Sequence, residues 1–346
     1  MATPNPLGDS QSTSNVSVKT FHIAGILTDV YGLEELSPNS QLVSCLWLLH
    51  PRLQKKETMA NVATACITAW NSRSPTEPKV GLIAVAFDQR NHGTREVNDL
   101  ANQAWRQGNP THAQDMFSIF HGTALDTSLL IDHLGSYVFH DLDQPSIDQH
   151  IVMGISLGGH SAWQVLFSDA RVASGIVIVG CPDYMNMMTD RARLSKLPSY
   201  TSSSGSSFLG SKDFPNALIA SCQKYDPKGL LFGTHPVPSA IPDSLIPYQG
   251  STSPKVRSVL SSSLAGKSIL VCSGGDDKLV PYRCSEPFLT FLKGATRKGG
   301  WWEEGGVHLE DNVYDGVGHM YSEDMKKDTV RFVCSQLENK SRTSKI

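Results

Sequence analysis

The feature that most constrains this chain is a glycine-rich turn around Ser156. Residues 154–159 read Gly-Ile-Ser-Leu-Gly-Gly, an apolar run comes directly before them, and an amphipathic helical pattern follows directly after. A strand that turns abruptly into a helix doubles its backbone back tightly, so bulky side chains at Gly154 and Gly158 would collide with neighbouring elements. The pattern predicts a strand-turn-helix unit that exposes Ser156 as a nucleophile. A plain glycine-rich connector is the alternative, and the flanking strand and helix patterns argue against it.

Strand and helix patterns alternate along most of the chain. Short apolar runs typical of buried strands occupy residues 80–87, 149–154, 173–179 and 268–273. Apolar residues at helical spacing occupy residues 57–70, 122–138, 157–167 and 287–292. Strands that alternate with helices predict a mostly parallel sheet covered by helices on both faces.

The two ends of the sheet are also marked in the sequence. Strand candidates at residues 17–26 and 41–50 bracket a polar turn, which predicts a hairpin-like entry. A last strand is expected at residues 307–313. A last helix is expected at residues 322–337, with Ser322 as its N-cap.

The 346 residues favour one catalytic domain with an insertion, because α/β domains often exceed 250 residues around one sheet. Residues 1–16 are polar and predict a disordered tail. Residues 185–250 are dense in Met, Ser, Pro and Gly and predict an inserted cap or lid. The core is then formed by residues 17–184 and 251–339, with a C-terminal tail at 340–346.

Composition narrows the class of function. The formal net charge of −3 comes from 30 basic and 33 acidic residues spread along the chain, which indicates neither a nucleic-acid nor an anionic-membrane partner. No apolar run is long enough for a membrane span, and the N-terminus lacks the pattern of a secretory signal. The odd number of cysteines, seven, in mostly apolar runs is typical of reduced core residues of an intracellular protein. A small-molecule substrate is therefore favoured, with no metal or organic cofactor.

An acid to orient a histidine is expected after a later strand. In folds with a serine on such a turn, the acid and the histidine follow it in that chain order. Asp277 follows the apolar run 269–272 and precedes Val280 and Pro281, and its loop position makes it the preferred acid. Asp276 is the rival, although an Asp in a glycine-rich turn often only bonds its own backbone.

The histidine is expected in the turn between the last strand and the last helix. His319 follows Gly316-Val317-Gly318, and a glycine-flanked loop at the carboxyl edge of the sheet can bring a general base to the serine hydroxyl. Any one of the 12 histidines is by itself more often structural than catalytic. The position of His319 behind the serine and aspartate motifs selects it.

Acyl transfer also needs donors for the oxyanion. They are usually the backbone N–H after the nucleophile and one from the loop after the third strand. Leu157 provides the first. Pro51 has no N–H, so Arg52 is expected to provide the second, with Leu53 in reserve. The Arg52 side chain has no assigned role and is otherwise expected to be a solvated loop residue.

With these residues in view, the chain resembles the α/β-hydrolase superfamily from about residue 17 to 339. Residues 87–93 resemble the Asp-x-Arg-Gly-x-Gly turn of that superfamily, with Asn91 in place of the first glycine. That turn is usually structural, so Asp88, Arg90 and His92 are left out of the catalytic set. The resemblance implies an α/β-hydrolase fold with an inserted cap and a serine esterase or thioesterase that works through an acyl-enzyme.

The chain also resembles, more narrowly, the hydrolases encoded in Alternaria host-selective toxin gene clusters. Those hydrolases help to make the epoxy-decatrienoic acid part of the AK, AF and ACT toxins, which implies a fatty-acyl or polyketide-derived acyl substrate. The last residues, Ser344, Lys345 and Ile346, resemble the Ser-Lys-Leu address read by the peroxisomal import receptor. Location in the peroxisome is therefore expected, with the cytoplasm as the alternative.

Two rival functions remain open at this point. An acyltransferase would use the same triad and differ only in the nucleophile that meets the acyl-enzyme. A ligand-binding protein on a hydrolase scaffold would lack catalysis, and the intact set of motifs argues against it. An epoxide hydrolase or dehalogenase of this fold would carry an Asp where this chain has Ser156.

Overall fold

The computed structural model describes residues 5–8, 15–73, 80–141, 144–238 and 253–343. The strands in these ranges are β1 Val18–Ile23, β2 Ile26–Tyr31, β3 Leu42–Leu49, β4 Gly81–Phe87, β5 Ser146–Ile155, β6 Val172–Ile178, β7 Ser268–Gly274 and β8 His308–Tyr314. They form an eight-stranded sheet in the order β1-β2-β4-β3-β5-β6-β7-β8. The pairs β1-β2 and β2-β4 are antiparallel, and the other neighbouring pairs are parallel.

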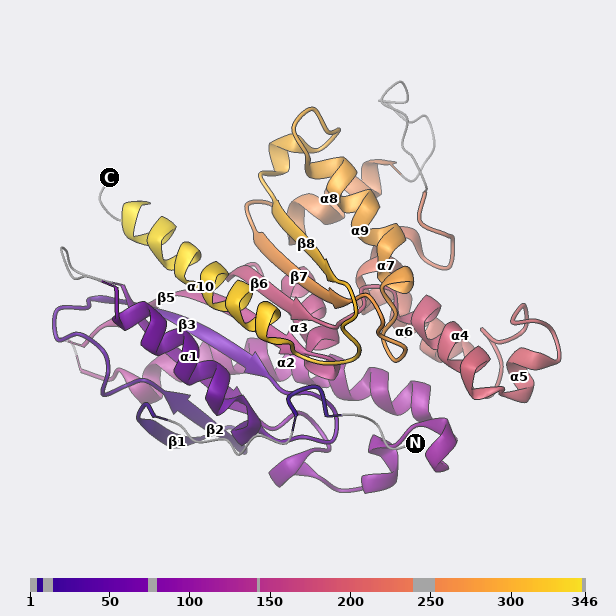
Figure 1. Ribbon diagram of the computed structural model, residues 1–346, viewed down its shortest axis with the longest axis horizontal. Helices are drawn as coiled ribbons and strands as arrows, with labels where there is room; N and C mark the ends of the chain where they lie inside the picture. The colour runs from indigo at the N-terminus through magenta and orange to yellow at the C-terminus, as the bar shows by residue number, and fades with distance from the viewer. Residues whose placement is uncertain (1–4, 9–14, 74–79, 142–143, 239–252, 344–346) are drawn as a thin grey trace.

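Helices flank the sheet on both faces (Figure 1). The α-helices are α1 Ala60–Asn71, α2 His112–Val138, α3 Leu157–Ser168, α4 Tyr184–Ser195, α5 Pro198–Thr201, α6 Asn216–Tyr225, α7 Pro227–Phe232, α8 Ser253–Ser263, α9 Tyr282–Thr296 and α10 Glu323–Thr343. Short 3-10 helices lie at η1 Lys56–Met59, η2 Gly93–Arg95, η3 Asp99–Asn102, η4 Trp105–Gln107 and η6 Glu303–Gly305. Residues of α1 and α10 pack on one face of the sheet, and residues of α2, α3, α8 and α9 pack on the other.

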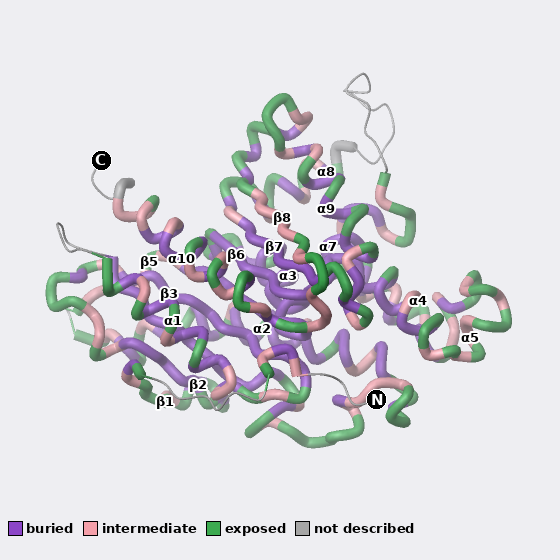
Figure 2. Tube along the Cα trace, viewed as in Figure 1, coloured by how far each residue is buried: buried purple, intermediate pink, exposed green. Residues whose placement is uncertain are grey.

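Alternation along the central strands explains the two apolar layers. In β5, Val152 belongs to the cluster under α2 and α3, whereas Ile151 and Met153 belong to the cluster under α1 and α10. Successive side chains of a strand point to opposite faces, so a strand covered on both faces is apolar throughout. Figure 2 shows the buried class following the central strands, while α5 at the far end is exposed or intermediate. The predicted parallel sheet is confirmed.

The predicted hairpin was wrong in its partners. The expected pairing joined residues 17–26 to 41–50, but β1 pairs with β2 through a tight turn at Ala24 and Gly25, with φ values of 51° and 82°. β3 lies instead in the middle of the sheet, between β4 and β5. The reason is burial: β3 is almost fully buried on both faces, whereas most of β1 is exposed, as suits an edge strand.

The helix α2 begins ten residues before the predicted start at residue 122, because its first turns serve a separate apolar cluster. Met116, Phe117 and Phe120 pack there with Tyr184 of α4, away from the sheet. The segment predicted as a cap contains nearly all of α4, then α5, α6 and α7, and part of it (239–252) lies outside the described residues. Its division from the core as a cap remains a prediction.

The chain ends differ from the expected tails. Residues 5–8 form a turn, and the carbonyl oxygen of Pro6 accepts a hydrogen bond from the Tyr321 amide at 2.8 Å. The predicted disordered tail 1–16 is therefore ordered at these residues, because apolar Leu7 and Val16 pack onto the core. At the other end α10 continues to Thr343, beyond the predicted end at 337. Residues 344–346, the predicted address, lie outside the described residues.

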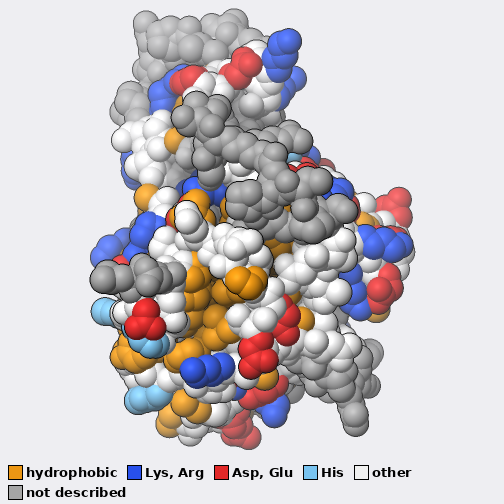
Figure 3. Space-filling model, turned by 90° about the vertical axis from the view of Figure 1, so that its left-hand side faces the viewer, with side chains coloured by type: hydrophobic (Ala, Val, Ile, Leu, Met, Phe, Trp, Pro, Cys, Tyr) orange, Lys and Arg blue, Asp and Glu red, His pale blue; other side chains and the backbone are white. Residues whose placement is uncertain are grey.

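The carboxyl ends of the parallel strands lie toward α4, and their amino ends lie at the opposite end of the molecule (Figure 1). Figure 3 views that opposite end, where apolar side chains gather on the surface. An open hollow next to the starts of β3 and β5 is lined by residues such as Leu36, Gln41 and Pro145. None of the residues predicted for chemistry lies in it.

Candidate active site

Ser156 lies in a sharp turn between β5 and α3. Its φ and ψ are 55° and −112°, a conformation that side-chain-bearing residues rarely adopt, and its amide donates to the Ile178 carbonyl oxygen at 2.9 Å. Glycines make the turn possible: a Cβ atom on Gly154 would lie 1.9 Å from the Gly158 oxygen. The local backbone therefore matches the turn predicted from the sequence.

The structure brings Ser156, His319 and Asp277 together from three separate loops. Ser156 Oγ lies 2.8 Å from His319 Nε2, and His319 Nδ1 lies 2.7 Å from Asp277 Oδ2. An ionised carboxylate can only accept, so Nδ1 carries the proton and Nε2 accepts from the serine hydroxyl. The imidazole is thus held in the tautomer that a general base for Ser156 needs.

Asp277 is held ionised by its surroundings. Its Oδ1 accepts from the amides of Leu279 at 2.8 Å and Val280 at 2.9 Å, which leaves Oδ2 for His319. Burial alone would raise the pKa of Asp277, but these hydrogen bonds and the charge of His319 outweigh it and lower that pKa. The carboxylate is therefore available to stabilise an imidazolium at neutral pH.

The rival acid, Asp276, is placed differently. Its residue is exposed, and its backbone amide donates to the Val317 oxygen at 2.9 Å. That bond ties the aspartate loop to the histidine loop, as does the close approach of Gly274 to Gly318, where a Cβ atom would lie 2.4 Å from the Gly318 oxygen. The loops after β7 and β8 are thus fixed to each other, and Asp276 contributes through its backbone.

The two candidate oxyanion donors lie on elements that pack against each other, the start of α3 and the loop after β3. Leu157 is the first residue of α3, where backbone N–H groups have no partner within the helix. Arg52 lies on the loop after β3, and the start of α3 packs against this loop, since a Cβ atom on Gly158 would lie 2.9 Å from the His50 oxygen. The Arg52 side chain is buried and donates to the Asn102 oxygen at 2.8 Å, so the alternative of a solvated loop residue does not hold. The roles of both N–H groups remain predictions.

The turn after β4 supports the loop after β3. The Gln89 amide donates to His50 Nε2 at 2.9 Å, and Asp88 accepts from the amides of Lys56 and Thr94, each at 2.9 Å. Asn91 has a φ of 57°, which Asn tolerates better than most residues and which suits a position that is glycine in the resembled turn. These contacts are structural.

Sequence reasoning missed two buried polar residues near the triad. His160 lies one helical turn after Ser156; its Nδ1 accepts the Cys181 amide at 3.0 Å, and its Nε2 has no partner among the described residues. Burial, with the charges of Arg191 and His319, lowers the pKa of His160 to about 3. Arg191 of α4 is buried and donates to the Leu279 oxygen at 3.0 Å. The position of His160 directly after the Ser156 motif was the available signal, and for Arg191 there was none.

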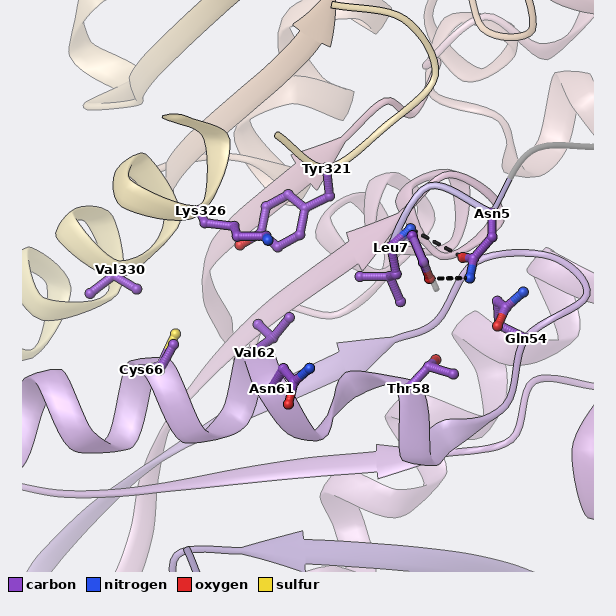
Figure 4. A pocket seen from close by; sticks show the side chains of 12 residues that line it. Asn5, Leu7, Gln54, Thr58, Asn61, Val62, Cys66, Tyr321, Lys326 and Val330 are labelled. Carbon is purple, nitrogen blue, oxygen red and sulfur yellow. Dashed lines mark hydrogen bonds between the residues drawn. The ribbon is translucent and has the colours of Figure 1, made fainter. Parts of the chain in front are cut away.

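A cavity of about 300 Å³ lies elsewhere, on the face covered by α1 and α10. Figure 4 shows Leu7 and Tyr321 beside it, above α1. Its lining includes none of the residues predicted for catalysis or for the oxyanion. The candidate site therefore rests on the hydrogen-bonded residues, and this cavity is separate from it.

The remaining predictions concern metal ions, membrane spans and the state of the cysteines. Within the described ranges, no group of three or more His, Cys, Asp or Glu residues could hold a metal ion. Among the same residues, no helix is both long and apolar enough to cross a bilayer. All seven cysteines are unpaired and buried, and burial raises the pKa of thiols such as Cys45 well above its ordinary value.

Comparison with known proteins identifies the fold. Neither a family model nor a curated protein matches the chain. The solved structure of TT1662 from Thermus thermophilus is 17% identical, covers 94% of this chain and 99% of its own, and gives a TM-score of 0.55. The Pyrococcus furiosus esterase Pf2001 is 14% identical over 92% of each chain, at a TM-score of 0.45. An esterase from Pyrobaculum calidifontis is 15% identical over 95% of this chain and 87% of its own, also at 0.45. The likeness to TT1662 and the order of the strands show the α/β-hydrolase fold.

Proposed function

We propose that this chain is a serine hydrolase that cleaves an ester or thioester bond through an acyl-enzyme. The observation that carries the proposal is the connected pair of hydrogen bonds from Ser156 Oγ to His319 Nε2 at 2.8 Å and from His319 Nδ1 to Asp277 Oδ2 at 2.7 Å. In this arrangement the hydroxyl is the nucleophile, the imidazole is the general base that activates it, and the ionised carboxylate orients the imidazole.

The acylation step follows from this geometry. His319 Nε2 removes the hydroxyl proton as Ser156 Oγ forms a bond to the acyl carbon, and the N–H groups of Leu157 and Arg52 stabilise the oxyanion. Asp277 stabilises the imidazolium. When the tetrahedral intermediate collapses, the bond to the leaving alcohol or thiol breaks, and the imidazolium returns the proton to it. In the second half, His319 removes a proton from water as its oxygen bonds to the acyl carbon. The bond from the acyl carbon to Ser156 Oγ then breaks, the imidazolium returns the proton to Oγ, and the free acid leaves.

The test is turnover of defined substrates by the purified chain. A panel of 4-nitrophenyl esters and acyl-CoA thioesters of increasing chain length should include substrates that release free acid. A folded Ser156→Ala variant should lose this activity by several orders of magnitude. Product analysis with an added alcohol or thiol acceptor separates hydrolysis from acyl transfer, because a transferase would form the new ester or thioester instead of the acid. No turnover of any ester or thioester would overturn the proposal.

For the acyl group we propose a fatty-acyl or polyketide-derived chain, as used in fungal toxin biosynthesis. Two points support this choice: the resemblance to the hydrolases of Alternaria toxin clusters, and the apolar cluster that joins Leu157 to the predicted cap. That cluster contains Met185, Met187 and Met188 of α4, all buried. Methionines are flexible and adapt to irregular apolar shapes. A preference for medium or long acyl chains in the substrate panel is expected, and a preference for acetyl esters would contradict it.

We infer that the predicted cap at residues 185–250 sets the acyl-chain preference. Support comes from the apolar cluster that contains both Leu157, the residue after Ser156, and the buried methionines of α4. Met185→Ala should change the preferred chain length while fluorophosphonate labelling of Ser156 is kept, and Leu194→Ala, at an exposed position of α4, is the control. An unchanged preference in a folded Met185→Ala protein would assign specificity to the core loops.

For location we propose the peroxisome, with the cytoplasm as the alternative. The support is the ending Ser344-Lys345-Ile346, which resembles a receptor-read address at the extreme C-terminus. A fluorescent reporter fused to the N-terminus should give puncta that coincide with a peroxisomal marker. Deletion of residues 344–346 should return the signal to the cytoplasm, and an unchanged pattern would show that the ending is incidental.

A further inference from the structure

Arg191 reaches from α4 to the loop that carries Asp277. Its Nη2 donates to the Leu279 carbonyl oxygen at 3.0 Å. Its Nη1 lies 3.1 Å from His112 Nε2 and 3.1 Å from Met116 Sδ, both on α2. The guanidinium is thus anchored on α2 at one end and bound to the aspartate loop at the other.

The carbonyl that Arg191 binds belongs to the peptide group that also binds Asp277. The Leu279 C=O and the Val280 N–H form one peptide unit, and that N–H donates to Asp277 Oδ1 at 2.9 Å. The other carboxylate oxygen accepts from His319. A continuous hydrogen-bonded series therefore runs from Arg191 through one peptide plane to Asp277 and on to His319.

The charge of Arg191 has no local counter-ion. Among the described residues, the hydrogen bonds of the guanidinium go to His112, Met116, Met187 and the Leu279 carbonyl, none of which is a carboxylate, and its Nε has no hydrogen-bond partner. His112 is a neutral acceptor, because burial, then the charges of Arg191 and Arg52, lowers its pKa well below the ordinary value. Burial also lowers the pKa of Arg191, and interactions with Tyr184 and then with Asp277 offset part of that lowering. A buried cation without an ion pair costs stability, so a packing role alone would be served better by an apolar residue.

We propose that Arg191 is a positioning residue of the triad, which holds the Leu279–Val280 peptide against Asp277 and so ties α4 to the catalytic geometry. The proposal rests on the proposed function. A cation at the carbonyl oxygen polarises the peptide and strengthens the hydrogen bond that its N–H donates. It also fixes the loop, and a shift of about 1 Å at a reacting group can cost roughly a hundredfold in rate.

The test compares variants of two arginines on the same helix. Arg191→Met removes the guanidinium in surroundings already rich in methionine, and Arg191→Lys keeps the charge but replaces the planar fork by a single point donor. Arg193→Met is the matched control, because Arg193 is exposed and pairs with Asp190, which keeps Arg283 as a second partner. The readouts are the melting temperature, kcat and KM on a small activated ester, and the downfield proton resonance of His319 Nδ1–H.

We expect folded Arg191→Met to lose kcat by roughly ten- to a hundredfold with KM little changed, and its Nδ1–H resonance to shift or broaden. Arg191→Lys should recover part of both, and Arg193→Met should match the unmodified chain. If Arg191→Met does not fold, the test is made on Arg191→Lys, by measuring the same Nδ1–H resonance of His319.

Two results would overturn the proposal. One is a kcat and a resonance in the Arg191 variants equal to those of Arg193→Met. The other is a raised KM with unchanged kcat, which would make Arg191 a substrate contact. The resonance does not depend on turnover, so a chain without esterase activity would refute the proposed function while the resonance still decides the role of Arg191.

Discussion

Gly158 lies so close to Leu49 that a Cβ atom on the glycine would be 2.0 Å from the leucine carbonyl oxygen. The first turn of α3 therefore presses directly on the end of β3. This contact places the helix start, with the Leu157 amide, beside the loop that carries Arg52. The glycine of the motif is needed for the approach of two backbones, in addition to the turn itself.

Replacing Gly158 by alanine should lower the free energy of unfolding by about 3 kcal/mol, since neither backbone can move without breaking sheet or helix hydrogen bonds. Gly294→Ala is the matched control. Gly294 lies inside α9 with no atom within 4 Å of a Cβ position, so alanine there should stabilise by up to about 1 kcal/mol. Urea unfolding followed by tryptophan fluorescence measures both. Equal stability of the two variants would refute the packing described for α3.

Ser156 should be more easily replaced by glycine than by alanine, as far as stability is concerned. The φ of 55° and ψ of −112° cost any residue with a Cβ roughly 1–3 kcal/mol, part of which glycine avoids. We expect both Ser156→Ala and Ser156→Gly to be inactive, and the glycine variant to be about 1 kcal/mol more stable by thermal unfolding. A less stable glycine variant would mean that the turn is relaxed.

The two neighbouring aspartates should differ sharply in their effect on rate. Asp277→Asn keeps the shape but removes the acceptor that fixes the His319 tautomer, and a loss on the order of 10⁴ in kcat is expected. Asp276→Asn keeps the backbone bond to Val317 and should remain within about threefold of the unmodified chain. Steady-state kinetics on one ester ranks them, and the reverse order would move the acid to Asp276.

His160 should contribute to loss of stability in acid. Its pKa is lowered to about 3 in the folded chain, mainly by burial, whereas an unfolded histidine titrates near about 6.5. Between these values the unfolded chain binds the extra proton, so the free energy of unfolding falls as the pH falls, by up to about 1.4 kcal/mol per pH unit. His160→Asn keeps an acceptor for the Cys181 amide and should make this slope shallower. Denaturant unfolding between about pH 4 and 6 tests it, and an identical slope would show that His160 is already protonated in the fold.

The sequence was sufficient for the features that depend on local geometry. The glycine-rich turn around Ser156 was predictable because only small residues fit where its backbone meets β3 and β6. Asp277 was preferred to Asp276 for its position in the loop before Val280 and Pro281, and in the structure its carboxylate accepts from the amides of Leu279 and Val280. The parallel sheet followed from apolar runs that are buried on both faces.

Features that depend on long-range packing were not predictable. β3 is buried on both faces and so lies between β4 and β5, which leaves β1 to pair with β2, yet the polar loop between β2 and β3 looked like a hairpin turn. Arg191 gave no signal because its partners on α2 and on the Asp277 loop are 75 or more residues away in the chain. Residues 112–121 looked unlike a sheet-covering helix because they pack against α4.

Fluorophosphonate labelling followed by peptide mass spectrometry shows whether Ser156 is a nucleophile activated by His319. We expect a single covalent adduct on the peptide that contains Ser156. It should form quickly in the unmodified chain, much more slowly in His319→Gln, and not at all in Ser156→Ala. Labelling of a different residue, or no labelling of the folded chain, would contradict it.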